Sequence, residues 1–375
     1  MLIDSLEGGV NRWRGFKETT WHHSRGTQLK LCPRTVPPRD RFRLVTHYAP
    51  AATDASGSRP GATGLRATQQ APRNQQKHGH QYDNNRHKPM HNNQTSALHH
   101  QPVSHRITCG DLELHYLACG AGEPLLLLHG WPTSSHLWRN VMPWLAPTHR
   151  VIALDLPGFG ESSKPLGRTY SFKFYTAAID AFLTELGIAR TALVVHDLGG
   201  PAGLMWAAKN PQKVSRLALL NTLVYPKVSW AVKAFLLATV LPGVRHWLVS
   251  PAGLQWTLRL GVVNKAAITP VVMKPYCAPF ASASARRALL QAARGMHPGG
   301  FTYIARQLPQ IGVPVRLIYG AKDRILPDIA ATMARLQADL PGAELTALPD
   351  CGHFLQEDAP AELGRLLADF FNPGT

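Results

Sequence analysis

The stretch Thr191-Ala-Leu-Val-Val-His196-Asp197-Leu198-Gly199-Gly200-Pro201 decides the fold expected for this chain of 375 residues. A short apolar run is typical of a fully buried strand, and a proline suits the first turn of a helix. The stretch therefore predicts a strand, a sharp turn and a helix, with Asp197 presented on the turn. A carboxylate in that position is a candidate nucleophile, and capping of the following helix is the structural alternative.

On both sides of this turn, apolar runs alternate with segments of helical spacing. The predicted strands are 112–118, 124–128, 150–154, 192–195, 214–220, 313–319 and 344–348, and the predicted helices are 135–145, 172–186, 201–210, 328–339 and 360–371. Continuous apolar runs favour buried parallel strands. Their alternation with helices predicts an α/β fold with a mostly parallel, doubly wound sheet.

Residues 223–312 interrupt this alternation with aromatic, proline-broken helical segments. Open α/β sheets bind their ligands at the carboxyl ends of the strands. We therefore expect 223–312 to form a helical cap over that edge, and 107–222 together with 313–375 to form the core.

The first 106 residues differ from the rest in composition. They hold 16 Lys+Arg against 6 Asp+Glu, whereas residues 107–375 hold 24 against 17. Their stretch from 69 to 105 is rich in Gln, Asn and His and has little apolar surface to bury, which predicts a disordered basic extension. It carries no recognised nucleic-acid-binding motif, so we expect no nucleic-acid partner. Met90 is a candidate alternative start.

Cysteine and hydropathy patterns limit which cellular compartment and which bound metals or cofactors we expect. The five cysteines follow no paired or CxxC pattern, which favours reduced thiols and a cytoplasmic protein. The sequence has no recognisable secretory signal and no apolar run long enough to span a bilayer. No Cys/His spacing fits a zinc module, so we expect neither a metal nor a cofactor.

Carboxylates are informative after the turn because they are scarce. The chain contains no Asp or Glu between Asp197 and Asp323. A nucleophile of this kind works with a histidine that an acid orients. The next predicted strand end, at 221–222, offers no acid, which leaves Asp323 by elimination. His353, on the loop after the last strand, completes the chain order nucleophile, acid, base. We expect its rival His196, which adjoins Asp197, to be structural.

An aspartate nucleophile indicates a particular chemistry. A carboxylate is already ionised at neutral pH and can displace a leaving group from sp³ carbon, forming an alkyl ester. His353, held by Asp323, would then activate water to hydrolyse that ester. The backbone N–H groups of Leu198 and Trp131 are the predicted oxyanion donors, and His129 is expected to support their loop.

Five segments together resemble the haloalkane dehalogenase and epoxide hydrolase branch of the α/β-hydrolases, and the resemblance covers residues 107–375. The segments are His-Gly-Trp-Pro-Thr-Ser-Ser-His-Leu-Trp-Arg-Asn140, Asp-Leu-Pro-Gly-Phe-Gly-Glu-Ser162, Val-His-Asp-Leu-Gly-Gly200, Pro-Tyr-Cys-Ala-Pro-Phe280 and Gly-His-Phe-Leu-Gln-Glu-Asp358. The resemblance implies an α/β-hydrolase fold with a small apolar substrate and water as reactants.

Two departures from the dehalogenase pattern concern the halide. One is Trp131, which stands after the His-Gly pair where dehalogenases usually have an asparagine as second halide donor, and the other is the residue after the nucleophile. Dehalogenases typically follow the nucleophile with a tryptophan whose indole N–H holds the departing halide, and this chain has Leu198 there. A halide without donors in an apolar pocket is unfavourable. Cleavage of a carbon–halogen bond would therefore need Trp131, or a cap tryptophan such as Trp230, as donor.

Epoxide hydrolysis is the alternative activity that the resemblance implies. Epoxide hydrolases use cap tyrosines that donate to the epoxide oxygen, and Tyr225, Tyr276 and Tyr303 are the candidates here. Each of these tyrosines could equally be a core aromatic. A third alternative is a hydrolase-fold protein that binds a ligand without turnover.

Overall fold

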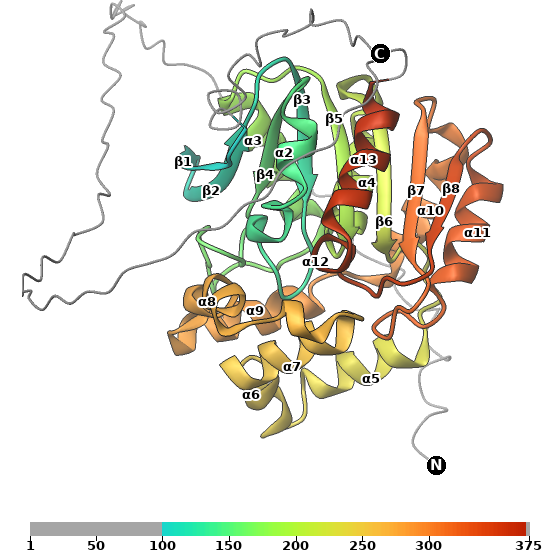
Figure 1. The fold of residues 1–375 in the computed structure, drawn as a ribbon. Coiled ribbons are helices and arrows are strands. Elements are labelled where there is room, and N and C mark those ends of the chain that lie inside the picture. Colours follow the sequence, from blue (N-terminus) through green and yellow to red (C-terminus); the bar gives the residue numbers. More distant parts are fainter. Residues whose placement is uncertain (1–99, 373–375) are drawn as a thin grey trace, which may run out of the picture. The chain divides into compact units, whose positions relative to one another are not determined.

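The computed structural model describes residues 100–372 and centres on one eight-stranded sheet. The strand order is β1-β2-β4-β3-β5-β6-β7-β8 (Figure 1). β1 pairs with β2 and β2 with β4 in antiparallel fashion, and every other neighbouring pair is parallel. The predicted α/β class and mostly parallel sheet are confirmed. Most of the predicted basic extension, 1–99, lies outside the described residues.

All seven predicted strands are present, and an eighth precedes them. The strands are β1 (Val103–Cys109), β2 (Leu112–Cys119), β3 (Glu123–Leu128), β4 (His149–Leu154), β5 (Thr191–Asp197), β6 (Val214–Thr222), β7 (Val315–Gly320) and β8 (Glu344–Leu348). β1 crosses the boundary expected after residue 106. Its residues are mostly exposed, so this edge strand lacks the apolar alternation by which a strand is recognised.

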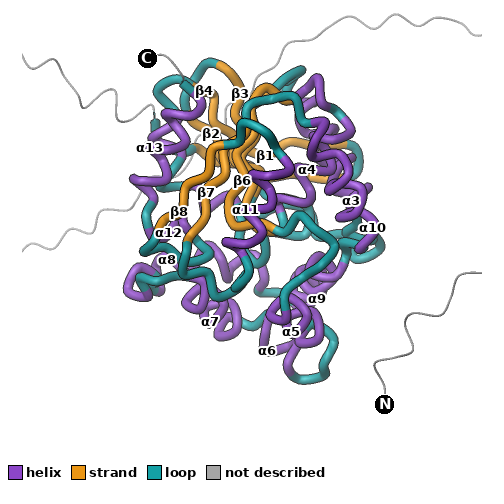
Figure 2. Tube along the Cα trace, turned by 90° about the vertical axis from the view of Figure 1, so that its right-hand side faces the viewer, coloured by secondary structure: helices purple, strands orange, loops and turns teal. Residues whose placement is uncertain are grey.

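Helices cover both faces of the sheet. They are α2 (Met142–Leu145), α3 (Phe172–Glu185), α4 (Gly199–Lys209), α11 (Ile329–Asp339), α12 (Leu355–Asp358) and α13 (Pro360–Phe371), with the short 3₁₀ turns η1 (Ser135–Trp138) and η2 (Pro211–Lys213). Figure 2 places α13 on one side of the sheet and α3 and α4 on the other. The single helix expected over 135–145 is divided into η1 and α2, because Pro143 in the first turn of α2 has no N–H to continue the earlier turn.

Residues 223–312 are helical. They form α5 (Trp230–Ala238), α6 (Val244–Leu248), α7 (Pro251–Gly261), η3 (Lys265–Ala267), α8 (Pro270–Cys277), η4 (Ala278–Phe280), α9 (Ala283–Arg294), α10 (Pro298–Gln307) and η5 (Leu308–Gln310). Figure 1 shows α5 to α9, here called the insertion helices, beyond one end of the sheet. α10 instead packs against α4 beside the sheet, so the range expected for the cap includes a helix of the core layer.

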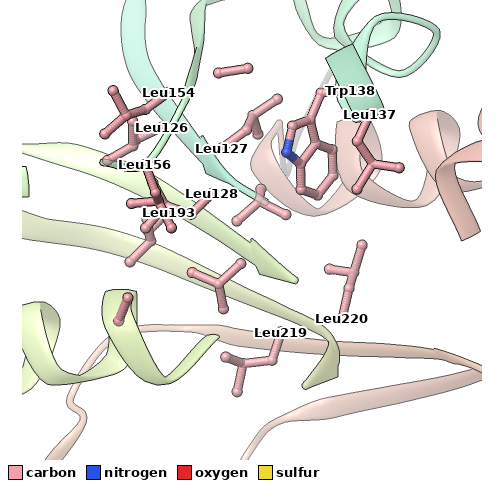
Figure 3. Packing of buried hydrophobic residues seen from close by; sticks show 14 of the residues in the cluster. Leu126, Leu127, Leu128, Leu137, Trp138, Leu154, Leu156, Leu193, Leu219 and Leu220 are labelled. Carbon is pink, nitrogen blue, oxygen red and sulfur yellow. The ribbon is translucent and has the colours of Figure 1, made fainter. Parts of the chain in front are cut away.

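The central strands are held together by a dense apolar core. Leu125–Leu128 of β3 are fully buried, as expected for a strand covered on both faces. Figure 3 shows leucines of neighbouring strands packed around them, with Trp138 of η1 alongside. None of the helices in residues 100–372 is long and apolar enough to cross a membrane.

Candidate active site

Asp197 is the last residue of β5, and α4 begins two residues later at Gly199. Its φ of 50° is a left-handed conformation that non-glycine residues adopt rarely and that is often found at functional sites. The Thr222 hydroxyl donates to the Asp197 carbonyl oxygen at 2.7 Å and fastens this turn to β6. Glycine is required at two neighbouring positions, because a Cβ on Gly200 would overlap Thr222 and one on Gly130 would overlap the Asp197 side chain.

The two oxygens of the Asp197 carboxylate have different surroundings. Oδ1 accepts the backbone N–H of Trp131 at 2.7 Å, and the backbone N–H of Leu198 also hydrogen-bonds the carboxyl group. Oδ2 lies 3.4 Å from Nε2 of His353. Burial alone would raise the pKa of Asp197, but the hydrogen bond and charge of His353 outweigh it and hold the pKa below its usual value. The carboxylate is therefore ionised.

His353 lies between two carboxylates. Its Nδ1 is 2.8 Å from Oδ2 of Asp323, on the side opposite the contact with Asp197, and its ring is fully buried. Burial alone would lower the pKa of His353, but the charges and hydrogen bonds of Asp323 and Asp197 raise it to about 10. The contact with Asp323 also fixes the tautomer, because Nδ1 must carry the proton that the carboxylate accepts.

Asp323 is held in place by a full set of donors. Its Oδ1 accepts the backbone N–H groups of Ile325 and Leu326, each at 2.8 Å. Its Oδ2 accepts the side-chain N–H of Asn221 at 2.7 Å as well as the N–H of His353. Burial alone would raise the pKa of Asp323, but the charge and hydrogen bond of His353, with the donors Leu326 and Asn221, lower it.

Asn221 is a site residue that sequence reasoning missed. It lies in β6 with a φ of 31°, and its Oδ1 accepts the backbone N–H of Gly320 at 3.0 Å. Positions 221–222 contain no acid, so no triad acid is expected at this strand end. The neutral Asn221 amide orients Asp323, which follows β7. In the sequence, the signal for this role is the position of Asn221 at the end of a buried strand.

The two remaining histidines near the turn are structural. Burial and the nearby positive charge of His353 lower the pKa of His196 to about 3, so its ring is neutral and its Nε2 donates to the His353 carbonyl oxygen at 2.9 Å. His129 accepts the Leu156 backbone N–H at 3.1 Å and contacts the Gly130 carbonyl oxygen at 3.0 Å. Its contacts brace the loop that carries the Trp131 donor.

Asp197 and Leu198 lie on the wall of a large apolar cavity. The cavity has a volume of about 610 Å³, and its wall includes Trp131 and side chains of α5, α6 and α7, Trp230 among them. The Trp131 indole N–H donates to the Leu289 carbonyl oxygen at 3.2 Å, and Leu198 offers no side-chain donor. Neither side chain is therefore free to hold a halide. Of the two expected kinds of halide donor, Trp131 is engaged elsewhere, whereas the cap tryptophan Trp230 lines the cavity.

The three tyrosines proposed as epoxide donors do not line this cavity. The Tyr225 hydroxyl donates to Asp339 at 2.7 Å, and the buried Tyr276 hydroxyl donates to Glu357 at 2.7 Å. Tyr303 lies on α10 and is partly exposed. The expectation that a cap tyrosine reaches the reacting atoms is not supported, because two of the hydroxyls already have carboxylate partners elsewhere.

The described part of the chain contains no cluster of metal-binding side chains, and its cysteines are free thiols. Residues 100–372 contain no group of His, Cys, Asp and Glu side chains arranged to hold a metal ion. Cys109, Cys119, Cys277 and Cys351 are free thiols, and burial raises the pKa of Cys119 and Cys351 to about 12. These two thiols are therefore protonated and unreactive. The cytoplasmic location stays a prediction.

Comparison with known proteins places this architecture. The model of the alpha/beta hydrolase fold family matches residues 123–360. The chain is 31% identical over 267 residues to haloalkane dehalogenase 2 of Mycobacterium tuberculosis, covering 69% of this chain and 91% of that protein. It is also 31% identical over 270 residues to a cis-3-alkyl-4-alkyloxetan-2-one decarboxylase of Shewanella oneidensis, covering 67% and 82%.

A solved structure agrees with these relatives. Haloalkane dehalogenase DbeA from Bradyrhizobium elkani superposes with a TM-score of 0.65 at 29% identity, over 72% of this chain and 97% of that one. The chain therefore belongs to the α/β-hydrolase family, in the branch that contains the haloalkane dehalogenases. It is an α/β-fold hydrolase.

Proposed function

We propose that this protein uses Asp197 as a nucleophile on sp³ carbon and passes through a covalent alkyl ester. One observation carries the proposal: an ionised carboxylate on a strained turn opens into an apolar cavity, with one oxygen held by the Trp131 backbone N–H and the other beside His353. Because this backbone donor holds Oδ1, Oδ2 is the attacking atom. In the proposed triad, Asp197 is the nucleophile, Asp323 orients the histidine and His353 is the base.

The second step uses the same donors. After Oδ2 is alkylated, Oδ1 becomes the carbonyl oxygen of the ester and already accepts the Trp131 backbone N–H, while the Leu198 N–H hydrogen-bonds the same carboxyl group. Attack of water on this carbonyl places negative charge on Oδ1, where those donors stabilise it. Alkylation also removes one of the two charges that raise the His353 pKa, so the imidazole becomes a competent base when water must be activated.

The leading substrate class is a haloalkane. Relatives named haloalkane dehalogenase support it, and the large apolar cavity suits an alkyl chain. The departing halide needs a donor, and the cavity-lining indoles of Trp230, Trp247 and Trp256 are the ones left once Trp131 is engaged. A cap tyrosine as acid in epoxide opening has less support, because no candidate tyrosine lines the cavity.

A β-lactone is the second candidate substrate, favoured by the engaged or missing halide donors and by the relative named an oxetan-2-one decarboxylase. Asp197 would attack the sp³ ring carbon bonded to the ring oxygen, breaking that carbon–oxygen bond to give an alkyl ester of Asp197 and a tethered carboxylate. Loss of CO₂ would then form the alkene as the ester bond breaks and the electron pair returns to Asp197. No water is consumed, and the leaving group never departs as a free anion.

The two chemistries separate in one experiment. The purified protein is incubated in parallel with a bromoalkane, a cis-dialkyl β-lactone and an epoxide, while bromide, CO₂ with alkene, and diol are measured. The same incubations use His353→Gln, with intact-mass analysis of the protein. Dehalogenation predicts bromide release and a stable alkyl adduct on Asp197 in that variant, because hydrolysis of the ester needs the histidine. Decarboxylation predicts CO₂ and alkene with no adduct, because the ester decays by elimination.

Asp197→Asn is the control for the nucleophile, and it must abolish whichever activity is found. Full activity in that variant would contradict the mechanism. Absence of turnover and of adducts with all three substrate classes would favour the alternative of a hydrolase-fold protein that binds ligands without chemistry.

A further inference from the structure

The surface of α5, α6 and α7 is apolar where a folded domain is normally polar. Trp230 is 74% exposed, Leu237 56%, Trp256 51% and Trp247 45%. The other exposed apolar side chains on these helices and the turn between α5 and α6 are Leu236, Val240, Leu241 and Val244. Exposed apolar side chains gathered on consecutive elements mark an interaction surface. We call these eight residues the apolar patch.

The helices of the apolar patch carry basic residues and no acidic ones. Residues 223–312 contain ten Lys and Arg and no Asp or Glu, and Lys233, Arg245 and Arg259 lie on the patch helices themselves. Within residues 100–372 none of these ten cations forms a salt bridge. Tryptophan, aliphatic and cationic side chains together are the composition of segments that lie in the interface of an anionic membrane.

The patch and the active-site cavity share residues. Trp230, Trp247 and Trp256 are exposed and also line the cavity that contains Asp197. Trp247 and Trp256 lie with ring centroids 5.5 Å apart, so the patch includes a paired aromatic surface. Both views place α5, α6 and α7 together at one end of the sheet (Figures 1 and 2). A molecule dissolved in lipid would reach the cavity from this end without crossing water.

We propose that the apolar patch docks the protein on an anionic lipid bilayer, from which apolar substrates enter the cavity. Charge decides between this occupant and a second copy of the chain. A symmetric contact through the patch would bring cations toward cations with no carboxylate between them, whereas anionic headgroups complement them. The substrate pathway rests on the proposed function, but bilayer binding does not.

Flotation of the full chain with lipid vesicles tests the docking. Vesicles of phosphatidylcholine alone and with a third phosphatidylglycerol are compared at low and high salt. Two double variants leave the cavity-lining residues unaltered: Leu237→Ser/Leu241→Ser changes the apolar patch, and Lys233→Gln/Arg245→Gln removes two cations on its helices. Lys173→Gln/Arg190→Gln removes two exposed cations elsewhere and serves as the matched control. The basic residues 1–106 are present in every protein, so their contribution to vesicle binding is common to all.

We expect binding to the anionic vesicles that weakens at high salt. The expected loss of vesicle binding is about fivefold for each of the two cations removed and at least about tenfold for the two leucines, with little change in the control. Circular dichroism and thermal unfolding verify that the variants are folded. Asp197→Asn must bind vesicles as the wild type does, so a failed catalytic proposal leaves this result intact.

Two outcomes overturn the proposal. One is no vesicle binding, and the other is vesicle binding that both double variants leave unchanged. If vesicle binding is absent and light scattering shows a dimer that Leu237→Ser/Leu241→Ser dissociates, a second copy of the chain covers the patch instead.

Discussion

The Asn221 side chain donates a hydrogen bond of 2.7 Å to Oδ2 of Asp323, the same oxygen that accepts the N–H of His353. β6 thus supplies a neutral donor at its carboxyl end, and the loop after β7 supplies the charge. Because Asn221 is also tied to the backbone N–H of Gly320, it sets the distance between the two strand ends at the site.

Asn221→Asp tests this relationship with the smallest change of shape. Aspartate tolerates the positive φ, but it replaces the donor with a second buried carboxylate beside Asp323. We expect turnover to fall on the order of tenfold or more and the free energy of unfolding by about 3 kcal/mol at neutral pH. Both losses should shrink at acid pH, where one carboxylate is protonated. Asn140→Asp, the same change at an exposed position, should alter neither quantity.

The His353 pKa gives stability a defined dependence on alkaline pH. The folded-state pKa of about 10 exceeds the unfolded value near 6.5, so the folded protein binds the proton more tightly. The contribution to stability is full below about pH 6.5, declines as the pH rises, and is lost above pH 10. Asp197→Asn removes one of the charges that raise the His353 pKa. The pH range over which His353 stabilises the folded protein should therefore be narrower in this variant. Urea unfolding between pH 6 and 10, with NMR titration of His353, measures both effects, and identical slopes in the two proteins would contradict the coupling.

Tyr276→Phe separates a structural tyrosine from a catalytic one. The Tyr276 hydroxyl donates to Glu357. The two carboxylate oxygens of Glu357 also accept N–H groups of the Arg139 guanidinium, at 2.6 and 2.8 Å. We expect a loss of about 1 kcal/mol in unfolding free energy and turnover within a factor of two of wild type. Tyr303→Phe is the exposed control. A loss of activity of a hundredfold with epoxides would instead show that Tyr276 acts as the acid.

Asp155 is expected to limit stability in acid. Burial alone would raise its pKa, but the hydrogen bond from His115, the charges of His129 and His115 and the Ser135 N–H lower it to about 2. Because the folded-state pKa lies below the unfolded value of 3.8, its stabilising effect is complete above about pH 4 and is lost as the pH falls toward 2. Asp155→Asn should lower the unfolding free energy at pH 7 by about 2 kcal/mol and flatten the acid slope. Asp111→Asn, at an exposed position, should leave that slope unchanged.

Much of the core and the candidate triad could be predicted from local pattern and scarcity. The apolar runs of β3 and β5 were recognisable because strands buried on both faces must be apolar throughout. Asp323 was recognisable because the chain has no other acid between Asp197 and that position. β1 was not predictable, since an exposed edge strand has no apolar requirement, and its pairing with β2 is a property of the assembled sheet.

What the sequence by itself determined is therefore the mostly parallel sheet, the turn at Asp197 and the order of its catalytic candidates. Only the tertiary structure decided which polar groups are already engaged. Trp131 finds its indole partner 158 residues away and Tyr276 its carboxylate partner 81 residues away. A buried donor takes whichever acceptor the folded chain brings within reach, and no local pattern encodes a partner at such separations.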